Sequence, residues 1–188
     1  MNESRGTCVW ANQVVVNRTV EYYSGRRGSI IIAPRGKMNI FFDMDYTIIE
    51  IDFGGLRPGV KEVFERLRAE GHTLYIWSGA GIRTEEVELL GLQDTVSGVF
   101  QKPWERYEKA VNDMLTRNEI PVLPDLVVDD TSAIVTALGG VVVQPYGVRI
   151  HNDHDMEQVY RIISEYASDG HSIDSAFRPK PPYAAHGG

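Results

Sequence analysis

The chain has 188 residues and a formal net charge of −7, with 43% hydrophobic and 24% charged residues. This composition is typical of a globular domain with a sizeable core, and no apolar stretch is long enough to cross a membrane. The net charge does not favour non-specific nucleic-acid binding by the whole chain. A single cysteine, Cys8, excludes an intrachain disulfide, and the first residues lead into no apolar signal core, so we expect a cytoplasmic protein.

Residues 1–37 differ in charge from the rest of the chain. They hold six basic and two acidic residues, a charge of +4, which leaves −11 for the remainder. β-rich stretches over 9–23 and 29–33 flank a Gly- and Arg-rich turn at 24–28, which predicts an N-terminal β-hairpin extension. Three roles stay open for it: an inert extension, an arm that binds a partner or nucleic acid, or a lid.

From Met38 onward, predicted strands alternate with predicted helices. Apolar runs predict strands near 38–43, 74–77, 99–100, 125–129 and 141–143. Apolar stripes predict helices between Pro58 and Gly71 and near 83–90, 104–117, 133–137 and 155–167. This alternation predicts an α/β domain over 38–168, with a doubly wound, Rossmann-like sheet of about five parallel strands. Residues 169–188 are rich in Gly, Pro, Ser and Ala, and we expect a disordered tail there.

Two of the predicted strands end in pairs of acidic residues. The run Ile40–Phe42 leads into Asp43 and Asp45, and the run 126–128 leads into Asp129 and Asp130. Burying nearby carboxylates is costly, because each loses its hydration and each repels the others. At the carboxyl ends of parallel strands all four would face the crevice where α/β sheets bind ligands. A hard divalent cation would balance their charge, and Mg²⁺ is the usual one beside phosphate.

Further polar residues follow the other predicted strands. In chain order, the strand ends supply Asp43 and Asp45, then Ser78, then Lys102, then Asp129 and Asp130. In this order, over residues 38–165, the chain resembles the haloacid dehalogenase-like phosphatase superfamily. The Asp-x-Asp-Tyr-Thr form of residues 43–47 and the lack of room for a cap domain look closest to magnesium-dependent phosphatase-1-like members.

The resemblance implies a Mg²⁺-dependent phosphomonoesterase. Asp43 would attack phosphorus and form an aspartyl-phosphate. Asp45 would protonate the leaving oxygen and then deprotonate the hydrolytic water. An acid at this second position favours phosphatase or phosphotransferase chemistry over dehalogenation.

The resemblance also implies the binding residues. Thr47, Ser78 and Gly79 would hold phosphate oxygens, and Lys102 would offset the negative charge of nucleophile and phosphate. The metal would be held by an Asp43 oxygen, the Asp45 backbone carbonyl and Asp130, with Asp129 beside it or acting through water. These residues come from different predicted strands, so we also expect the folded chain to bring them together in one site.

The short spacings between the motifs leave no room for a separate cap domain, so we expect an open site. An open site fits a phosphorylated small molecule or a macromolecular phosphoester, and the sequence identifies neither the substrate nor the oligomeric state. Structural roles compete for several residues: Thr47 could brace its loop through a backbone hydrogen bond, Ser78 could cap a helix, and Lys102 could be a solvated loop residue.

Two alternative functions remain on the same fold. One is phosphotransfer to an acceptor other than water. The other is a non-catalytic binding protein that contacts its partner through the basic N-terminal hairpin. A scaffold has no need of both Asp43 and Asp45, which favours the enzyme.

Overall fold

The structure is a computed structural model that describes residues 36–50, 54–147 and 153–181, and the backbone of three N-terminal strands. These strands are β1 (Val14–Val16), β2 (Thr19–Ser24) and β3 (Ser29–Ile32). They pair antiparallel in the order β1-β2-β3. The predicted turn at 24–28 lies almost entirely outside the described residues, so the predicted hairpin extension stays a prediction.

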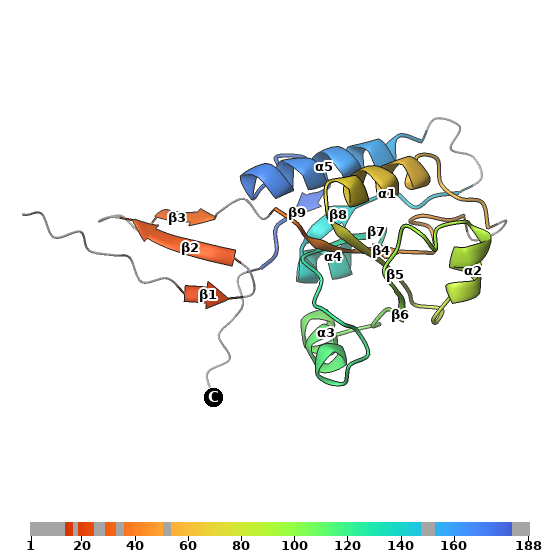
Figure 1. Cartoon of the computed structure of the whole chain (residues 1–188), viewed down its shortest axis with the longest axis horizontal. Helices are drawn as coiled ribbons and strands as arrows, with labels where there is room; N and C mark the ends of the chain where they lie inside the picture. The colour runs from red at the N-terminus through yellow and green to blue at the C-terminus, as the bar shows by residue number, and fades with distance from the viewer. Residues whose placement is uncertain are drawn as a thin grey trace, which may run out of the picture.

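From residue 39 the chain alternates strands with helices (Figure 1). In chain order the elements are β4 (Asn39–Asp43), α1 (Val60–Ala69), β5 (Thr73–Ser78), α2 (Thr84–Leu89), β6 (Val99–Gln101), α3 (Tyr107–Thr116), β7 (Leu126–Asp129), α4 (Ser132–Leu138), β8 (Gly140–Val142), α5 (Asp155–Asp169) and β9 (Phe177–Arg178). The α/β alternation predicted from the apolar runs is therefore confirmed.

One six-stranded sheet forms the centre of this part of the chain. Its strand order is β6-β5-β4-β7-β8-β9, in which the first five strands are parallel and β9 is antiparallel. Successive connections run outward in one direction from β4 to β6 and in the other from β7 to β8. The order therefore reverses between β4 and β7, and a crevice at such a reversal is where α/β sheets bind ligands.

Helices cover both faces of the sheet, with α1 and α5 on one face and α3 and α4 on the other (Figure 1). Within β4 the side chains alternate: Ile40 and Phe42 pack with α1 and α5, whereas Phe41 packs with α3 and α4. All three are fully buried. Strands buried on both faces read as continuous apolar runs, which is why the sequence revealed them.

The C-terminal segment differs from its prediction. Residue 169 ends α5, and β9 then pairs with Gly140 and Val141 of β8 and forms the edge of the sheet. Phe177 is only 8% exposed, and its ring centroid lies 5.0 Å from that of Tyr166. The expected disorder is thus wrong for residues 169–181, because one buried aromatic ring and an open sheet edge fix a segment whose composition is polar. Residues 182–188 lie outside the described residues.

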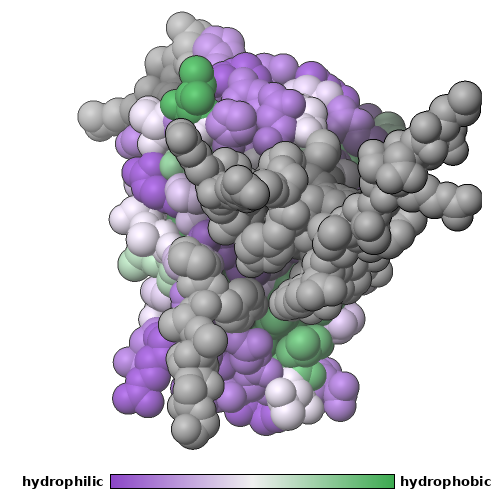
Figure 2. Space-filling view, turned by 90° about the vertical axis from the view of Figure 1, so that its left-hand side faces the viewer, coloured by the Kyte–Doolittle hydropathy of each residue, from purple (hydrophilic) through white to green (hydrophobic). Residues whose placement is uncertain are grey.

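The surface in Figure 2 is mostly hydrophilic where it belongs to described residues, with hydrophobic residues in small, separate groups. In the described part of the chain, no helix has both the length and the apolar character needed to span a membrane.

Candidate active site

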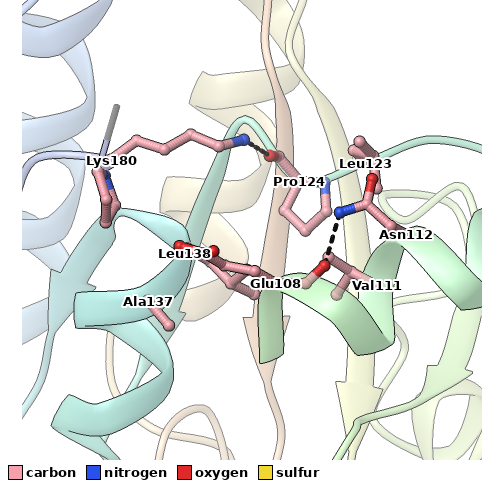
Figure 3. Close-up of a pocket in the computed structure, with 9 residues that line it drawn as sticks. Glu108, Val111, Asn112, Leu123, Pro124, Ala137, Leu138 and Lys180 are labelled. Carbon is pink, nitrogen blue, oxygen red and sulfur yellow. Dashed lines mark hydrogen bonds between the residues drawn. The ribbon is translucent and has the colours of Figure 1, made fainter. Parts of the chain in front are cut away.

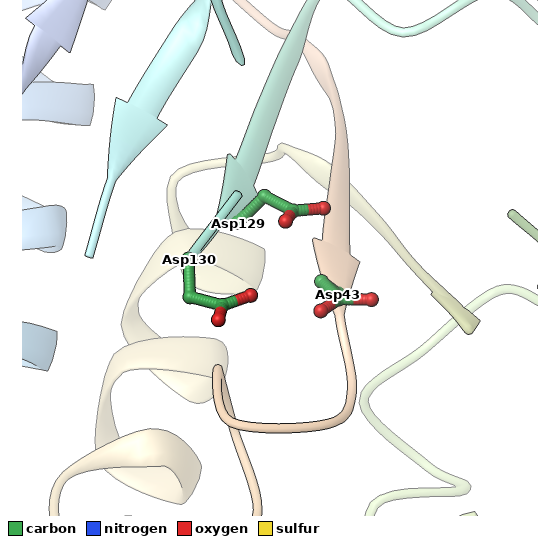
Figure 4. A group of neighbouring side chains, drawn as sticks. All are labelled: Asp43, Asp129 and Asp130. Atoms are coloured by element: carbon green, nitrogen blue, oxygen red, sulfur yellow. The ribbon is translucent and has the colours of Figure 1, made fainter. Parts of the chain in front are cut away.

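Three acidic residues meet where β4 and β7 lie side by side (Figure 4). Phe42 pairs with Val128, so the next residues, Asp43 and Asp129, end their strands at the same level. Asp130 follows directly. One carboxylate oxygen from each of Asp43, Asp129 and Asp130 lies within 4.8 Å of the others. The parallel register thus brings together three of the predicted site residues.

Asp43 is the most strongly perturbed of these acids. It is 2% exposed, and burial, followed by the charge of Asp129, raises its pKa to about 7, against the opposing effect of Lys102. Its Oδ2 accepts a hydrogen bond from Thr47 Oγ1 at 3.3 Å. Its buried Oδ1 accepts no hydrogen bond of regular geometry from the described residues, although Lys102 Nζ lies 2.7 Å away. The ammonium of Lys102 is therefore the neighbour of this oxygen among the described residues.

Lys102 bridges the two strand-end acids. Its Nζ lies 2.7 Å from Asp43 Oδ1 and 3.0 Å from Asp129 Oδ2. Burial disfavours the ammonium, but the two carboxylates outweigh this effect and raise the pKa of Lys102. Its backbone amide donates to Ser78 O at 2.9 Å, which ties the end of β6 to the end of β5. The side chain is therefore held within the site instead of being solvated in a loop.

The carboxylates of Asp129 and Asp130 differ in the hydrogen bonds that they accept from the protein. Asp129 is fully buried, and burial raises its pKa. It accepts hydrogen bonds from Lys102 Nζ and, at 2.8 Å, from the backbone amide of Thr131. Asp130 is partly exposed, and its carboxylate accepts only a long contact of 3.5 Å from Thr131 Oγ1 among the contacts of the described chain. Asp130 therefore has the carboxylate that is freer to bind a cation.

Asp45 points to a different part of the site. Its Oδ2 accepts a hydrogen bond from Ser78 Oγ at 2.9 Å, and its Oδ1 forms an ion pair with Arg83. Ser78 Oγ in turn accepts from the backbone amide of Ala80 at 3.0 Å. The carboxylate of Asp45 is thus outside the three-acid group, and its predicted metal contact through the backbone carbonyl stays a prediction.

Arg83 is a site residue that the sequence analysis missed. It also pairs with Glu86, at 3.0 Å, so its guanidinium is fixed between a loop acid and an acid of α2. The available signal was its place in the loop that follows Ser78, between β5 and α2. That signal is weak, because a loop arginine can point anywhere.

Thr47 links the ends of β4 and β7 through hydrogen bonds of its hydroxyl group. It is fully buried, and its hydroxyl contacts Asp43 and accepts a hydrogen bond from the backbone amide of Asp130 at 3.1 Å. Its carbonyl accepts from Arg57 Nη1 at 3.1 Å. Arg57 is 1% exposed and also binds Asp153 and Asp155. The loop after β4 is therefore locked to the start of α5, and the structure gives Thr47 the bracing role considered above.

A second cleft lies between α3 and α4, near the amino end of β7 (Figure 3). Pro124, just before β7, and Leu138, at the end of α4, line it. Lys180 Nζ donates to the carbonyl of Pro124 at 3.0 Å across its mouth. The strand-end acids do not reach this cleft, so it is not the candidate site.

The donor set fits a hard divalent cation. Three carboxylates and one lysine meet here, which leaves two negative charges when all are ionised. Oxygen ligands are those that Mg²⁺ prefers. Asp43 at the end of β4 and Asp130 directly after β7 provide such ligands.

Comparison with known proteins adds a distant structural likeness. Neither a protein-family model nor a curated protein matches the chain. Among solved structures, it is similar to the crystal structure of an uncharacterized protein from Listeria monocytogenes serotype 4b. The two share 13% sequence identity with a TM-score of 0.44, over 62% of this chain and 84% of that chain. A similarity of this size assigns neither a family nor an activity.

Proposed function

We propose that the protein is a Mg²⁺-dependent phosphomonoesterase of the haloacid dehalogenase-like kind, with Asp43 as its nucleophile. The observation that carries the proposal is the buried Oδ1 of Asp43, which accepts no regular hydrogen bond from the described residues. It lies beside a lysine and two further acids at the reversal point of the sheet. A buried carboxylate beside two further acids is costly to maintain, and a nucleophile that must approach phosphorus gives it a use.

Asp43, Asp129 and Asp130 would hold the Mg²⁺ ion. When bound, Mg²⁺ supplies positive charge against the phosphoryl oxygens, on which negative charge develops during transfer. Lys102 adds a second positive charge, fixed between Asp43 and Asp129 before substrate arrives. The repulsion between an anionic nucleophile and an anionic ester is thereby reduced.

The reaction proceeds in two steps at phosphorus. In the first, an oxygen of Asp43 forms a bond to phosphorus, the ester bond breaks, and protonated Asp45 gives its proton to the leaving oxygen. In the second, a water attacks the aspartyl-phosphate while Asp45 takes a proton from it. The bond between phosphorus and Asp43 then breaks, which releases phosphate and restores the free carboxylate.

The contacts of Asp45 support its role in the second step. Ser78 and Arg83 hold its carboxylate away from the three-acid group. Both contacts fix the orientation of the carboxylate that would accept a proton from water. The separation of Asp43 and Asp45 into two environments is the arrangement expected when two acids have different tasks.

The test is release of phosphate from 4-nitrophenyl phosphate with Mg²⁺ and with EDTA, followed by a panel of sugar phosphates, nucleotides, phosphopeptides and phosphorylated oligonucleotides. Asp43→Asn should reduce Mg²⁺-dependent turnover to background, because an amide forms no aspartyl-phosphate. Asp94→Asn is the matched control, because Asp94 is exposed and should leave turnover unchanged. Full activity of folded Asp43→Asn protein, or no hydrolysis across the panel, would contradict the proposal. The second result would favour the non-catalytic alternative.

A further inference from the structure

Large apolar side chains are exposed around the candidate active site. Five are exposed in the described part of the chain, and Leu89 and Ile173 lie elsewhere, in α2 and after α5. The other three are Tyr46 (41% exposed), Ile82 (66%) and Trp104 (75%), which we call the rim. They occupy the loops after β4, β5 and β6, three neighbouring strands whose carboxyl ends face the same way.

Each rim residue adjoins a charged residue of the site along the chain. Tyr46 follows Asp45 directly, Ile82 precedes Arg83, and Trp104 comes two residues after Lys102. Tyr46 also has a left-handed backbone, with φ of 58°. This conformation is uncommon and strained for a bulky residue, and such residues gather at functional sites. Exposed apolar groups contribute little to folding, and these three occupy loops that also carry charged residues of the site.

The indole of Trp104 marks one side of the site. A Cβ placed on Gly79 would lie 3.1 Å from Cη2 of Trp104, so the indole rests on the backbone directly after Ser78. Ser78 binds the carboxylate of Asp45. The indole is therefore on the Asp45 side, beyond β5, whereas the predicted metal ligands of β7 lie on the other side of β4.

We infer that Trp104 is a specificity-determining residue that selects phosphomonoesters with an aromatic ring close to the ester oxygen. This inference rests on the proposed function, in which Asp45 gives its proton to the leaving oxygen. The organic part of the substrate leaves on the side of Asp45, which is where Trp104 lies on Gly79. Tyr46 follows Asp45 along the chain, and Ile82 precedes Arg83, which pairs with Asp45.

An aromatic ring fits this rim better than a saturated ring of the same size. The 75% exposed indole offers a flat π surface, and aromatic pairs gain affinity beyond the area that they bury. The expected gain is about two- to tenfold in affinity. A sugar or glycerol carries hydroxyl groups that would lose water against this rim without gaining hydrogen bonds from it.

The experiment compares benzyl phosphate with cyclohexylmethyl phosphate on the full chain with Mg²⁺. Both esters release a primary alcohol, and the remaining difference in leaving-group acidity cancels when the ratio of the two esters is compared between wild-type and Trp104→Leu protein. Wild-type protein should show a kcat/KM about two- to tenfold higher for benzyl phosphate. Trp104→Leu should abolish this preference by lowering kcat/KM for benzyl phosphate alone. Leu89→Ala, which changes an exposed apolar residue of α2, should preserve it.

Binding of the two esters to wild-type and Trp104→Leu protein, measured by calorimetry, separates failure of this inference from failure of the proposed function. If benzyl phosphate binds more tightly, the preference depends on Trp104 and neither ester is hydrolysed, the result supports the selection of an aromatic ring by Trp104. The same result contradicts the proposed phosphatase activity. Equal hydrolysis of both esters, with an equal effect of Trp104→Leu on each, contradicts the selection of an aromatic ring by Trp104. It supports the proposed phosphatase activity. Absence of both binding and hydrolysis overturns both.

Discussion

Metal-free protein should lose stability as the pH rises through the range in which Asp43 ionises. The ordinary pKa of this group is 3.8, and burial, followed by the charge of Asp129, raises it to about 7 in the folded state. Between these values the folded protein holds a proton that the unfolded chain has lost. The free energy of unfolding therefore falls as the pH rises from about 4 to about 7, and it levels off above that range.

The size of this effect follows from the two pKa values. A shift of about 3 pKa units corresponds to about 4 kcal/mol, of which about 3 kcal/mol is lost between pH 5 and pH 8. Asp43→Asn removes the titrating group and should flatten the profile by that amount. It should also make the metal-free protein more stable than wild type at pH 8, because it removes a buried charge.

The assay is urea unfolding in EDTA, followed by circular dichroism at pH 5, 6, 7 and 8. His72 contributes an opposite slope, because burial lowers its pKa. This contribution cancels in the comparison, since both proteins keep His72. Parallel profiles for wild type and Asp43→Asn would refute the reasoning. Mg²⁺ should stabilise wild type at pH 8 more than Asp43→Asn, because a bound cation replaces the proton on Asp43.

Three further predictions concern the metal, a buried ion pair and a glycine. Asp130→Ala should reduce the Mg²⁺-induced rise in Tm more than Asp129→Ala does, because Asp129 already accepts hydrogen bonds from the protein. Arg57→Met should lower the free energy of unfolding in urea by about 3 to 5 kcal/mol, because it leaves buried carboxylate charge unpaired. Gly140→Ala should cost about 3 kcal/mol or more, since its Cβ would lie 1.9 Å from a carbonyl oxygen of β7. Gly147→Ala, with nothing within 4 Å of the new Cβ, should change stability by less than about 0.5 kcal/mol and is the control.

The alternation of strands and helices was predictable because each element carries its own periodic signal. Strands β4, β5 and β7 are buried on both faces, so their apolar runs stand out and end abruptly at polar residues. The positions of Asp43 and Asp129 at strand ends follow from that pattern. The C-terminal strand was missed because β9 is two residues long and is fixed by the edge of β8, which lies far away along the chain.

The sequence by itself determined which side chains end the strands, since a residue that follows a buried run must emerge at an edge of the sheet. It did not determine which strands are neighbours, and only the tertiary structure put β4 beside β7 and so brought Asp43 within reach of Asp129 and Asp130. The tertiary structure also determined the pairing of Asp45 with Arg83 and the contact of Trp104 with Gly79. Loop side chains have no periodicity to reveal their direction, and their partners are set by packing between segments distant in the chain.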